Sequence, residues 1–260
     1  MGQIIYPVTI DGIDLNTITG LTVLSTNPYI FPKRSLSMNA IARSNSSKVT
    51  TGYYTDRQVA VTINISRNTR SLLEQSLDSL TAIIQGIEKE LILPQSGTLR
   101  KYIVTYSDSV VKVNGGSYIE MDLIFVCSDH LGYSLQYEKL LDTTARTLYN
   151  YTDSFTISGS ADTQVPVIVA FISALTGATS NIITIKNVAT TQGITVSRAY
   201  TAGDRLIIDV YNKTVTVNGV AVEYTGAFPE FAPGIGYLNY QDNFKTRTLA
   251  LSAYYYKRYI

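Results

Sequence analysis

GDRLIIDVYNKTVTVNGVAVEYTGAFPEFAPGIGYLNY, residues 203–240, is the stretch that decides the fold of this chain. It begins with a turn signal, Gly203-Asp204, after which Leu206, Ile208 and Val210 recur at every second position. Because side chains alternate between the two faces of a strand, this spacing predicts a strand with one strongly apolar face.

The same stretch predicts a hairpin after that strand. Val215 and Val217 alternate with threonines, and Asn218-Gly219 is the residue pair that tolerates positive φ in a tight two-residue turn. Apolar residues then resume the period at Val220, Val222 and Tyr224. Three short strands joined by turns are expected, which is a β-meander.

These residues resemble a known family. The letters Gly203-Asp204, Ile208-Asp209, Thr216-Val217-Asn218-Gly219, Phe228-Pro229 and Pro233-Gly234 resemble the C-terminal, galectin-like domain of the distal tail proteins (Dit) of long-tailed, non-contractile bacteriophages. The resemblance is clearest over residues 155–260, and over the N-terminal half it depends on the order of elements. It implies a non-enzymatic ring protein, usually hexameric, that joins the last tail-tube ring to the hub.

The partners that the resemblance implies are other tail components and further copies of the chain. They are the tail-tube protein, the tail-tip hub and tape-measure proteins, and receptor-binding proteins at the periphery. The expected location is the virion tail tip and its baseplate, after synthesis in the host cytoplasm. The resemblance brings no catalytic position, no cofactor and no metal.

Composition agrees with a protein that acts through contact. Charged residues make up 16% of the 260 residues and the net charge is +1, so a basic face for specific nucleic-acid binding is not expected. Tyrosine is abundant at 20 residues, and it is enriched at protein interfaces and in strands alike. The longest apolar run, 165–175, is too short to span a bilayer, and 1–10 lacks the pattern of a signal peptide, so a soluble chain is expected.

The first half is expected to combine strands with one helix. Strands are predicted at 4–10, 21–24, 36–42, 49–54 and 59–65, and at 102–106, or on to 113, and 118–127. Between 36 and 51 the Ser/Asn-rich ARSNSSKVTT suits an exposed loop or the tip of a long hairpin. Apolar steps of four and three over residues 70–91 predict a helix with a capping box at Ser71 and Glu74, and a coiled coil is the second interpretation.

The fold class is therefore mainly β. We expect an N-terminal β-sandwich or barrel with one packed helix at 1–140, an interdomain connection within 128–153, and a galectin-like antiparallel β-sandwich at 150–260. Further strands are predicted at 167–172, 181–188, 194–198, 237–240 and 248–256. A single all-β domain of this length is the alternative.

Residue types for catalysis are scarce. His130 is the only histidine and Cys127 the only cysteine, so the usual zinc sets and an internal disulfide are excluded. The run Ser128-Asp129-His130 contains triad residue types, but a triad needs a spatial arrangement, and a polar turn after a buried strand is the preferred interpretation. Cys127 is expected to be a buried small hydrophobe.

Glu120 and Asp122 lie two apart on a predicted strand and project to one face. Three interpretations stay open: the solvated side of a strand, an acid/base pair of a glycoside hydrolase, or carboxylates that line the bore of a ring and repel DNA phosphates.

Saccharide binding is the main alternative function, as a carbohydrate-binding module or adhesin. Tyr200, Tyr211, Tyr224 and Tyr237 offer rings that could stack on a sugar, but the chain has no tryptophan. Fold-level analogy does not license a binding site, so a scaffold is favoured. A tail-tube protein is a further alternative, because tube proteins also combine a β-barrel with a helix, as is expected for the first half of this chain.

Overall fold

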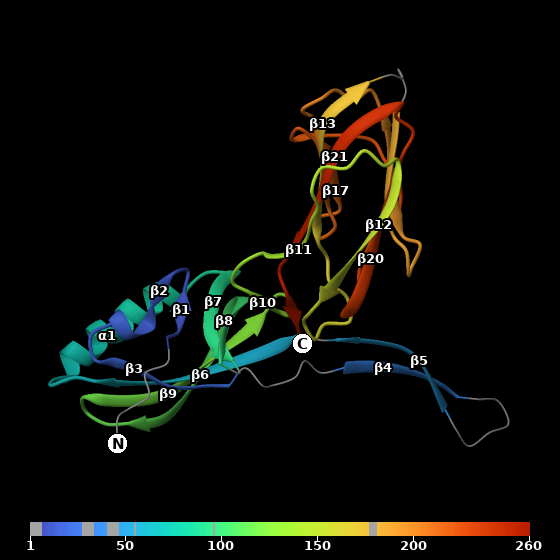
Figure 1. The fold of residues 1–260 in the computed structure, drawn as a ribbon. Helices are drawn as coiled ribbons and strands as arrows, with labels where there is room; N and C mark the ends of the chain where they lie inside the picture. Colours follow the sequence, from blue (N-terminus) through green and yellow to red (C-terminus); the bar gives the residue numbers. More distant parts are fainter. Residues whose placement is uncertain (1–6, 28–33, 41–46, 55, 96, 177–180) are drawn as a thin grey trace. The chain divides into compact units, whose positions relative to one another are not determined.

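The fold was analysed in a computed structural model, which describes residues 7–27, 34–40, 47–54, 56–95, 97–176 and 181–260. The chain divides into two compact units, residues 1–135 with Ile260, and residues 136–259. Both are built mainly of antiparallel strands, and the described residues hold one α-helix, so the predicted mainly-β class is confirmed (Figure 1).

One large antiparallel sheet makes up most of the first unit, in the order β2-β1-β7-β8-β9-β6-β3. Strand β10 pairs with β8 beyond the end of β9. The strands are β1 (Thr9–Ile10), β2 (Ile13–Asp14), β3 (Leu21–Asn27), β6 (Arg57–Ser66), β7 (Lys89–Gln95), β8 (Thr98–Asn114), β9 (Tyr118–Cys127) and β10 (Gly132–Ser134).

The central strands of this sheet follow their sequence pattern. In β6, Val59, Val61, Ile63 and Ile65 are fully buried, and β9 alternates in the same way, because every second residue faces the core. Helix α1 (Arg70–Ile84) packs on this core through its own apolar stripe, Leu73, Leu80 and Ile84. Figure 1 shows α1 against the strands of the first unit.

The helix is shorter than its apolar spacing predicts. It ends at Ile84, and Gly86 then takes a φ of 109°, a conformation that favours glycine and turns the chain. Leu91 is buried in strand β7, whereas Ile87 is 78% exposed. The expected helix to residue 91 is therefore wrong, because Leu91 fits both a helical stripe and the two-residue period of a strand.

The expected capping box is also wrong. The residue that caps the helix is Thr69, whose Oγ1 accepts from the Leu72 backbone N at 3.3 Å. Glu74 instead pairs with Arg70 one turn away, with its Oε1 2.9 Å from Arg70 Nε.

Strands β4 (Arg34–Ala40) and β5 (Ser47–Tyr54) pair with each other as a separate antiparallel hairpin. A hairpin in this part of the chain was one of the two expectations from the Ser/Asn-rich segment. The residues between these strands, 41–46, lie outside the described residues, as do residues 4–6 of the strand predicted at 4–10.

Two antiparallel sheets pack face to face in the second unit, as the sequence predicts for a sandwich. One has the order β11-β21-β13-β16-β17-β18 and the other β12-β20-β14-β15-β19. Strands of the first sheet are β11 (Glu138–Asp142), β13 (Val167–Thr176), β16 (Arg205–Asp209), β17 (Thr214–Val217), β18 (Val220–Ala221) and β21 (Thr246–Tyr255). Those of the second are β12 (Asn150–Ile157), β14 (Asn181–Asn187), β15 (Gly193–Arg198), β19 (Thr225–Gly226) and β20 (Gly234–Asp242).

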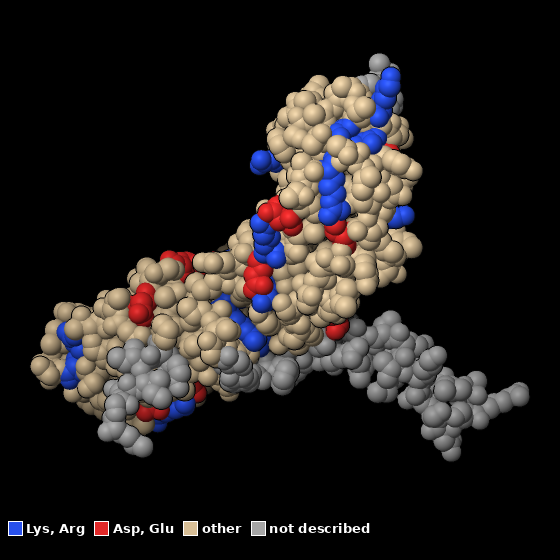
Figure 2. Space-filling model, in the orientation of Figure 1, with Lys and Arg blue, Asp and Glu red and all other residues tan. Residues whose placement is uncertain are grey.

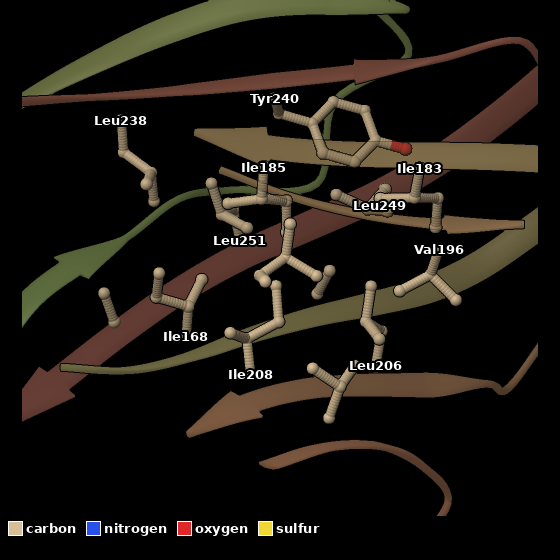
Figure 3. Packing of buried hydrophobic residues seen from close by; sticks show 14 of the residues in the cluster. Ile168, Ile183, Ile185, Val196, Leu206, Ile208, Leu238, Tyr240, Leu249 and Leu251 are labelled. Carbon is tan, nitrogen blue, oxygen red and sulfur yellow. The ribbon is translucent and has the colours of Figure 1, made fainter. Parts of the chain in front are cut away.

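The core of the second unit lies between these sheets. Figure 3 shows its aliphatic side chains pointing toward one another from both sheets: Ile168, Ile183, Ile185, Val196, Leu206, Ile208, Leu238, Leu249 and Leu251, with Tyr240 beside them. All are at most 1% exposed. This packing fixes the loops and strand ends that form the surface of the unit.

The turn of the meander has the predicted geometry. Asn218 and Gly219 have φ values of 52° and 80°, as a two-residue turn with positive φ at both positions requires. The predicted resumption of the period is only partly right, because β18 has two residues, and Val220 and Tyr224 are exposed. The meander β16-β17-β18 itself is confirmed.

The segment 128–153 is more structured than a connection. It contributes β10 to the first unit and β11 to the second, and the break between the units falls between Leu135 and Gln136.

The side chain of Gln164 forms hydrogen bonds with the backbone of Arg258, the first residue of the short strand β22 (Arg258–Tyr259) near the C-terminus. Gln164 Oε1 accepts from the Arg258 backbone N at 2.9 Å, and Gln164 Nε2 donates to its carbonyl at 3.2 Å.

Candidate interaction surfaces

Glu120 and Asp122 lie on the face of β9 opposite the core, as the alternation predicts. Asp122 accepts from Thr62 Oγ1 at 2.6 Å and forms an ion pair with Lys112 Nζ at 2.7 Å. Glu120 accepts from the Tyr118 hydroxyl at 3.2 Å. The Asp122 carboxylate is therefore neutralised by a lysine, whereas Glu120 forms no ion pair within the described residues.

The surroundings of Asp122 favour its ionised form. Partial burial raises the pKa of this carboxyl, but hydrogen bonds from Lys112 and Thr62 and the lysine charge outweigh that effect and hold the pKa below its usual value. A carboxylate kept ionised by a lysine is poorly suited to donate a proton near neutral pH. The arrangement gives a fixed polar face and no acid/base pair.

A long edge of strand β8 is open on the first unit. Strand β7 pairs with β8 only as far as Val104, while β9 pairs with the other side through to Asn114. No described strand pairs with the β7 side beyond Val104. Val110, Val111 and Val113 in this part are 46–50% exposed.

Exposed valines on an unpaired strand are a site for pairing with another chain. We define the part of β8 from residue 106 to 114 as the open β8 edge. The sequence indicates that the strand could continue to 113, but it does not indicate that its neighbour stops early. The edge was therefore not identified from the sequence.

Ser128, Asp129 and His130 form a polar bend after β9, which agrees with the preferred interpretation. Asp129 accepts from the Leu131 backbone N at 3.2 Å and from the Tyr133 hydroxyl, and its Oδ1 lies 3.4 Å from His130 Nδ1. The Asp129 carboxylate therefore stabilises the bend.

Beside this bend, Arg57 is only 1% exposed, with its guanidinium carbon 5.1 Å from the centre of the Tyr102 ring. Burial raises the pKa of the neighbouring Cys127 thiol to about 12, so Cys127 is a packing residue as expected.

The four candidate tyrosines do not form one platform. Tyr200 is buried and packs edge-on against Phe244 at 5.8 Å, so its ring is not available to stack on a sugar. Tyr211, Tyr224 and Tyr237 are 55%, 39% and 43% exposed. They lie in the turn after β16, the connection before β19 and strand β20.

Charge is mixed on the face of the molecule that Figure 2 shows. Figure 2 shows Lys and Arg close to Asp and Glu on the visible face, without a broad area of one sign among the described residues. The described residues include no group of three or more side chains suited to hold a metal ion. Within the same residues, no helix has the length and hydropathy to cross a membrane.

Comparisons with known proteins identify the second unit by sequence. A family model described as the siphovirus-type tail component, C-terminal domain, matches residues 158–259. This span contains both sheets of the sandwich apart from β11 and β12. A search of curated proteins finds no match.

Solved structures extend the similarity to both units. The chain is similar to the crystal structure of Dit from phage SPP1, described as a paradigm of the hub adsorption apparatus in phages that infect Gram-positive bacteria. The TM-score is 0.71 at 15% identity, and the match covers 99% of this chain and 100% of that one.

A protein in the activated baseplate of phage P2 is also similar, at 9% identity with 97% and 98% of the two chains covered. Its TM-score of 0.49 is too low to support an argument about function. By sequence, residues 158–259 therefore match the C-terminal domain of the siphovirus-type tail component family, and along almost its whole length the chain has the fold of a distal tail protein (Dit).

Proposed function

We propose that this chain forms a ring adaptor at the distal end of a siphophage tail, between the tail tube and the hub that carries the receptor-binding apparatus. The observation that carries the proposal is the match of both units, along the whole length, to the fold of a Dit protein described as part of a hub. The family of the C-terminal domain supports a structural role in the tail.

The open β8 edge supports self-association through the first unit. The open β8 edge has nine residues of backbone and three half-exposed valines, and an edge of this kind pairs readily with other chains. In a ring, a neighbouring copy of the chain would occupy this edge and prevent uncontrolled pairing. Strand β3 is at the other end of the same sheet. Two different edges allow a head-to-tail contact, which closes into a ring when the rotation between copies allows it. Six copies is the number that the family resemblance suggests.

In this ring, Glu120 and Asp122 face the bore. Carboxylates there repel DNA phosphates, so that DNA passes without adhering. Because Lys112 neutralises Asp122, Glu120 supplies most of the repulsion in this pair. A structure of the ring tests the placement, and Glu120 and Asp122 on its outer surface would contradict it.

The proposed partners are further copies of the chain, the tail-tube protein, the hub and tape-measure proteins, and receptor-binding proteins at the periphery. The location is the tail tip of the virion, after synthesis in the host cytoplasm. A net charge of +1 favours protein contacts over specific binding to nucleic acid or to a membrane.

The proposed role is structural and not enzymatic. A glycosidase would need two carboxyl groups facing each other across a substrate site, but Glu120 and Asp122 lie on one strand face, and Asp122 is held by Lys112 and Thr62. Hydrolysis of host-wall polymers by the purified chain, abolished in both Glu120→Gln and Asp122→Asn, would contradict this part of the proposal.

Immunogold labelling of intact virions tests the adaptor role. Antibodies against the chain should label one end of the tail only, at the tip. Label along the length of the tail would identify a tail-tube protein, and label at the head or an absence from the virion would overturn the proposal.

A further inference from the structure

A shallow hollow of about 320 Å³ opens in the second unit, at the end of strand β15. It is lined by Ser197, Arg198 and Ala199 on one side and by Val222 and Glu223 on the other. Its volume is near the lower end of the range for small-ligand sites, enough for a sugar unit. The tail-adaptor function does not use it.

Arg198 is held in place on one wall. Its Nε donates to the Ala199 carbonyl at 3.1 Å, and its guanidinium carbon lies 5.7 Å from the centre of the Tyr200 ring. Tyr200 is itself buried against Phe244. Because these two contacts already hold the guanidinium, little conformational entropy of the Arg198 side chain is lost when a ligand binds. Its terminal nitrogens can still donate hydrogen bonds to that ligand.

Glu223 stands on the opposite wall, in the connection between β18 and β19. Strand β19 pairs with β15 through Thr195 and Thr225, so this connection runs beside the end of β15. Within the described residues, Arg198 and Glu223 form no ion pair with each other or with a third residue. A cationic donor and an anionic acceptor therefore line the same hollow, and the charge of Arg198 is also felt by Asp204.

The other residues that line the hollow suit a sugar, because one face of a sugar ring is apolar. Val222 and Ala199 supply aliphatic surface, and Ser197 adds a hydroxyl. Aliphatic surface beside a donor and an acceptor is an arrangement that complements the C–H face and the hydroxyl groups of a sugar.

We infer that this hollow binds one unit of a neutral saccharide, with Arg198 donating to ring hydroxyls and Glu223 accepting from them. Each sugar hydroxyl both donates and accepts, so a polyol satisfies the two walls together. An anionic sugar would gain from Arg198 but would be repelled by Glu223, which favours a neutral ligand. Such a site would give the tail tip a weak hold on an uncharged surface glycan.

Saturation-transfer NMR on the purified full chain tests this inference. The probes are the methyl glycosides of glucose, galactose, rhamnose and N-acetylglucosamine, with glucose 6-phosphate as the anionic comparison. We expect saturation transfer to at least one neutral glycoside, and a loss of affinity of about tenfold or more in Arg198→Ala and in Glu223→Gln. Arg205→Ala is the matched control, because Arg205 is exposed on β16 beside Phe171 at 5.9 Å and should leave binding unchanged.

Three results would overturn the inference. The first is an absence of saturation transfer to every neutral glycoside at about 10 mM, a concentration at which even mM affinity is detected. The second is binding of glucose 6-phosphate alone, and the third is unchanged binding of a neutral glycoside in both Arg198→Ala and Glu223→Gln. Circular dichroism of each variant shows whether the fold is kept, and Ser197→Trp, which fills the hollow and leaves both charges in place, should abolish binding independently.

Discussion

The ion pair between Asp242 and Arg247 is the most deeply buried charged contact of the described residues. The two atoms Oδ1 and Nη2 are 2.9 Å apart, and the side chains are 0% and 8% exposed. The carboxylate also accepts from the Tyr240 hydroxyl at 2.7 Å and the Phe244 backbone N at 2.8 Å. Asp242→Ala should reduce the free energy of unfolding by about 3–5 kcal/mol, because it leaves a buried cation without its partner.

A half-exposed pair in the same unit provides the control. Glu230 Oε1 lies 2.7 Å from Lys213 Nζ, with side chains 33% and 49% exposed. Glu230→Gln should cost about 1 kcal/mol or less. Urea unfolding of the full chain measures both, and equal costs for the two variants would contradict the importance of burial here.

Alanine substitutions at two glycines distinguish the cost of backbone strain from the cost of a steric clash. Gly219 and Gly226 have φ values of 80° and 105°, but a Cβ on Gly226 would lie 2.0 Å from the Gly193 carbonyl oxygen, whereas a Cβ on Gly219 meets nothing within 4 Å. Gly219→Ala should cost about 1–2 kcal/mol through strain alone. Gly226→Ala should cost clearly more, because β19 must also separate from β15, and thermal unfolding that ranks the two in the opposite order would refute this account.

Asp122 should make stability depend on pH in the acid range. Its pKa is lowered in the folded chain, so its contribution is complete above the unfolded value, near pH 4, and is lost as the pH falls through the lower folded value. Between about pH 5 and pH 2, the free energy of unfolding should fall less in Asp122→Asn than in the wild type. Parallel slopes of the two proteins would contradict the interaction with Lys112 and Thr62.

Single elements show what the sequence could predict and where it could not. Strands β6 and β9 have strict alternation over ten residues, which only a half-buried strand explains, and both were predicted. The end of α1 was missed because pairing of β7 with β8, a contact distant from the helix, decides the conformation of Leu91. Arg198 and Glu223 were missed because only the pairing of β15 with β19 brings their segments together.

The open β8 edge gives a prediction at the same scale. Val111→Lys places a charge on an exposed strand edge, a change that blocks pairing with another chain but leaves the folded unit intact. We expect loss of the ring with a free energy of unfolding within about 0.5 kcal/mol of the wild type. Val220→Lys, at a 68% exposed position of β18, is the control that should keep the ring. Multi-angle light scattering measures both, and an unchanged assembly of Val111→Lys would exclude this edge.

At the scale of the whole molecule, the proposed function is assembly through shape and contact. The two units have separate cores, so the proposed ring contacts can belong to the first unit and the hollow at Arg198 and Glu223 to the second. The sequence supplied the family and the strand pattern of the second unit. It could not supply the interfaces, because they depend on which edges the folded sheets leave open.

The most direct test is the mass and shape of the purified full chain, by mass photometry together with negative-stain electron microscopy. The account predicts closed, hollow rings with a mass close to six times that of one chain. A monomer at every concentration up to about 100 µM, or open tubes of indefinite length, would contradict it, since a closed ring is the symmetry that a head-to-tail adaptor requires.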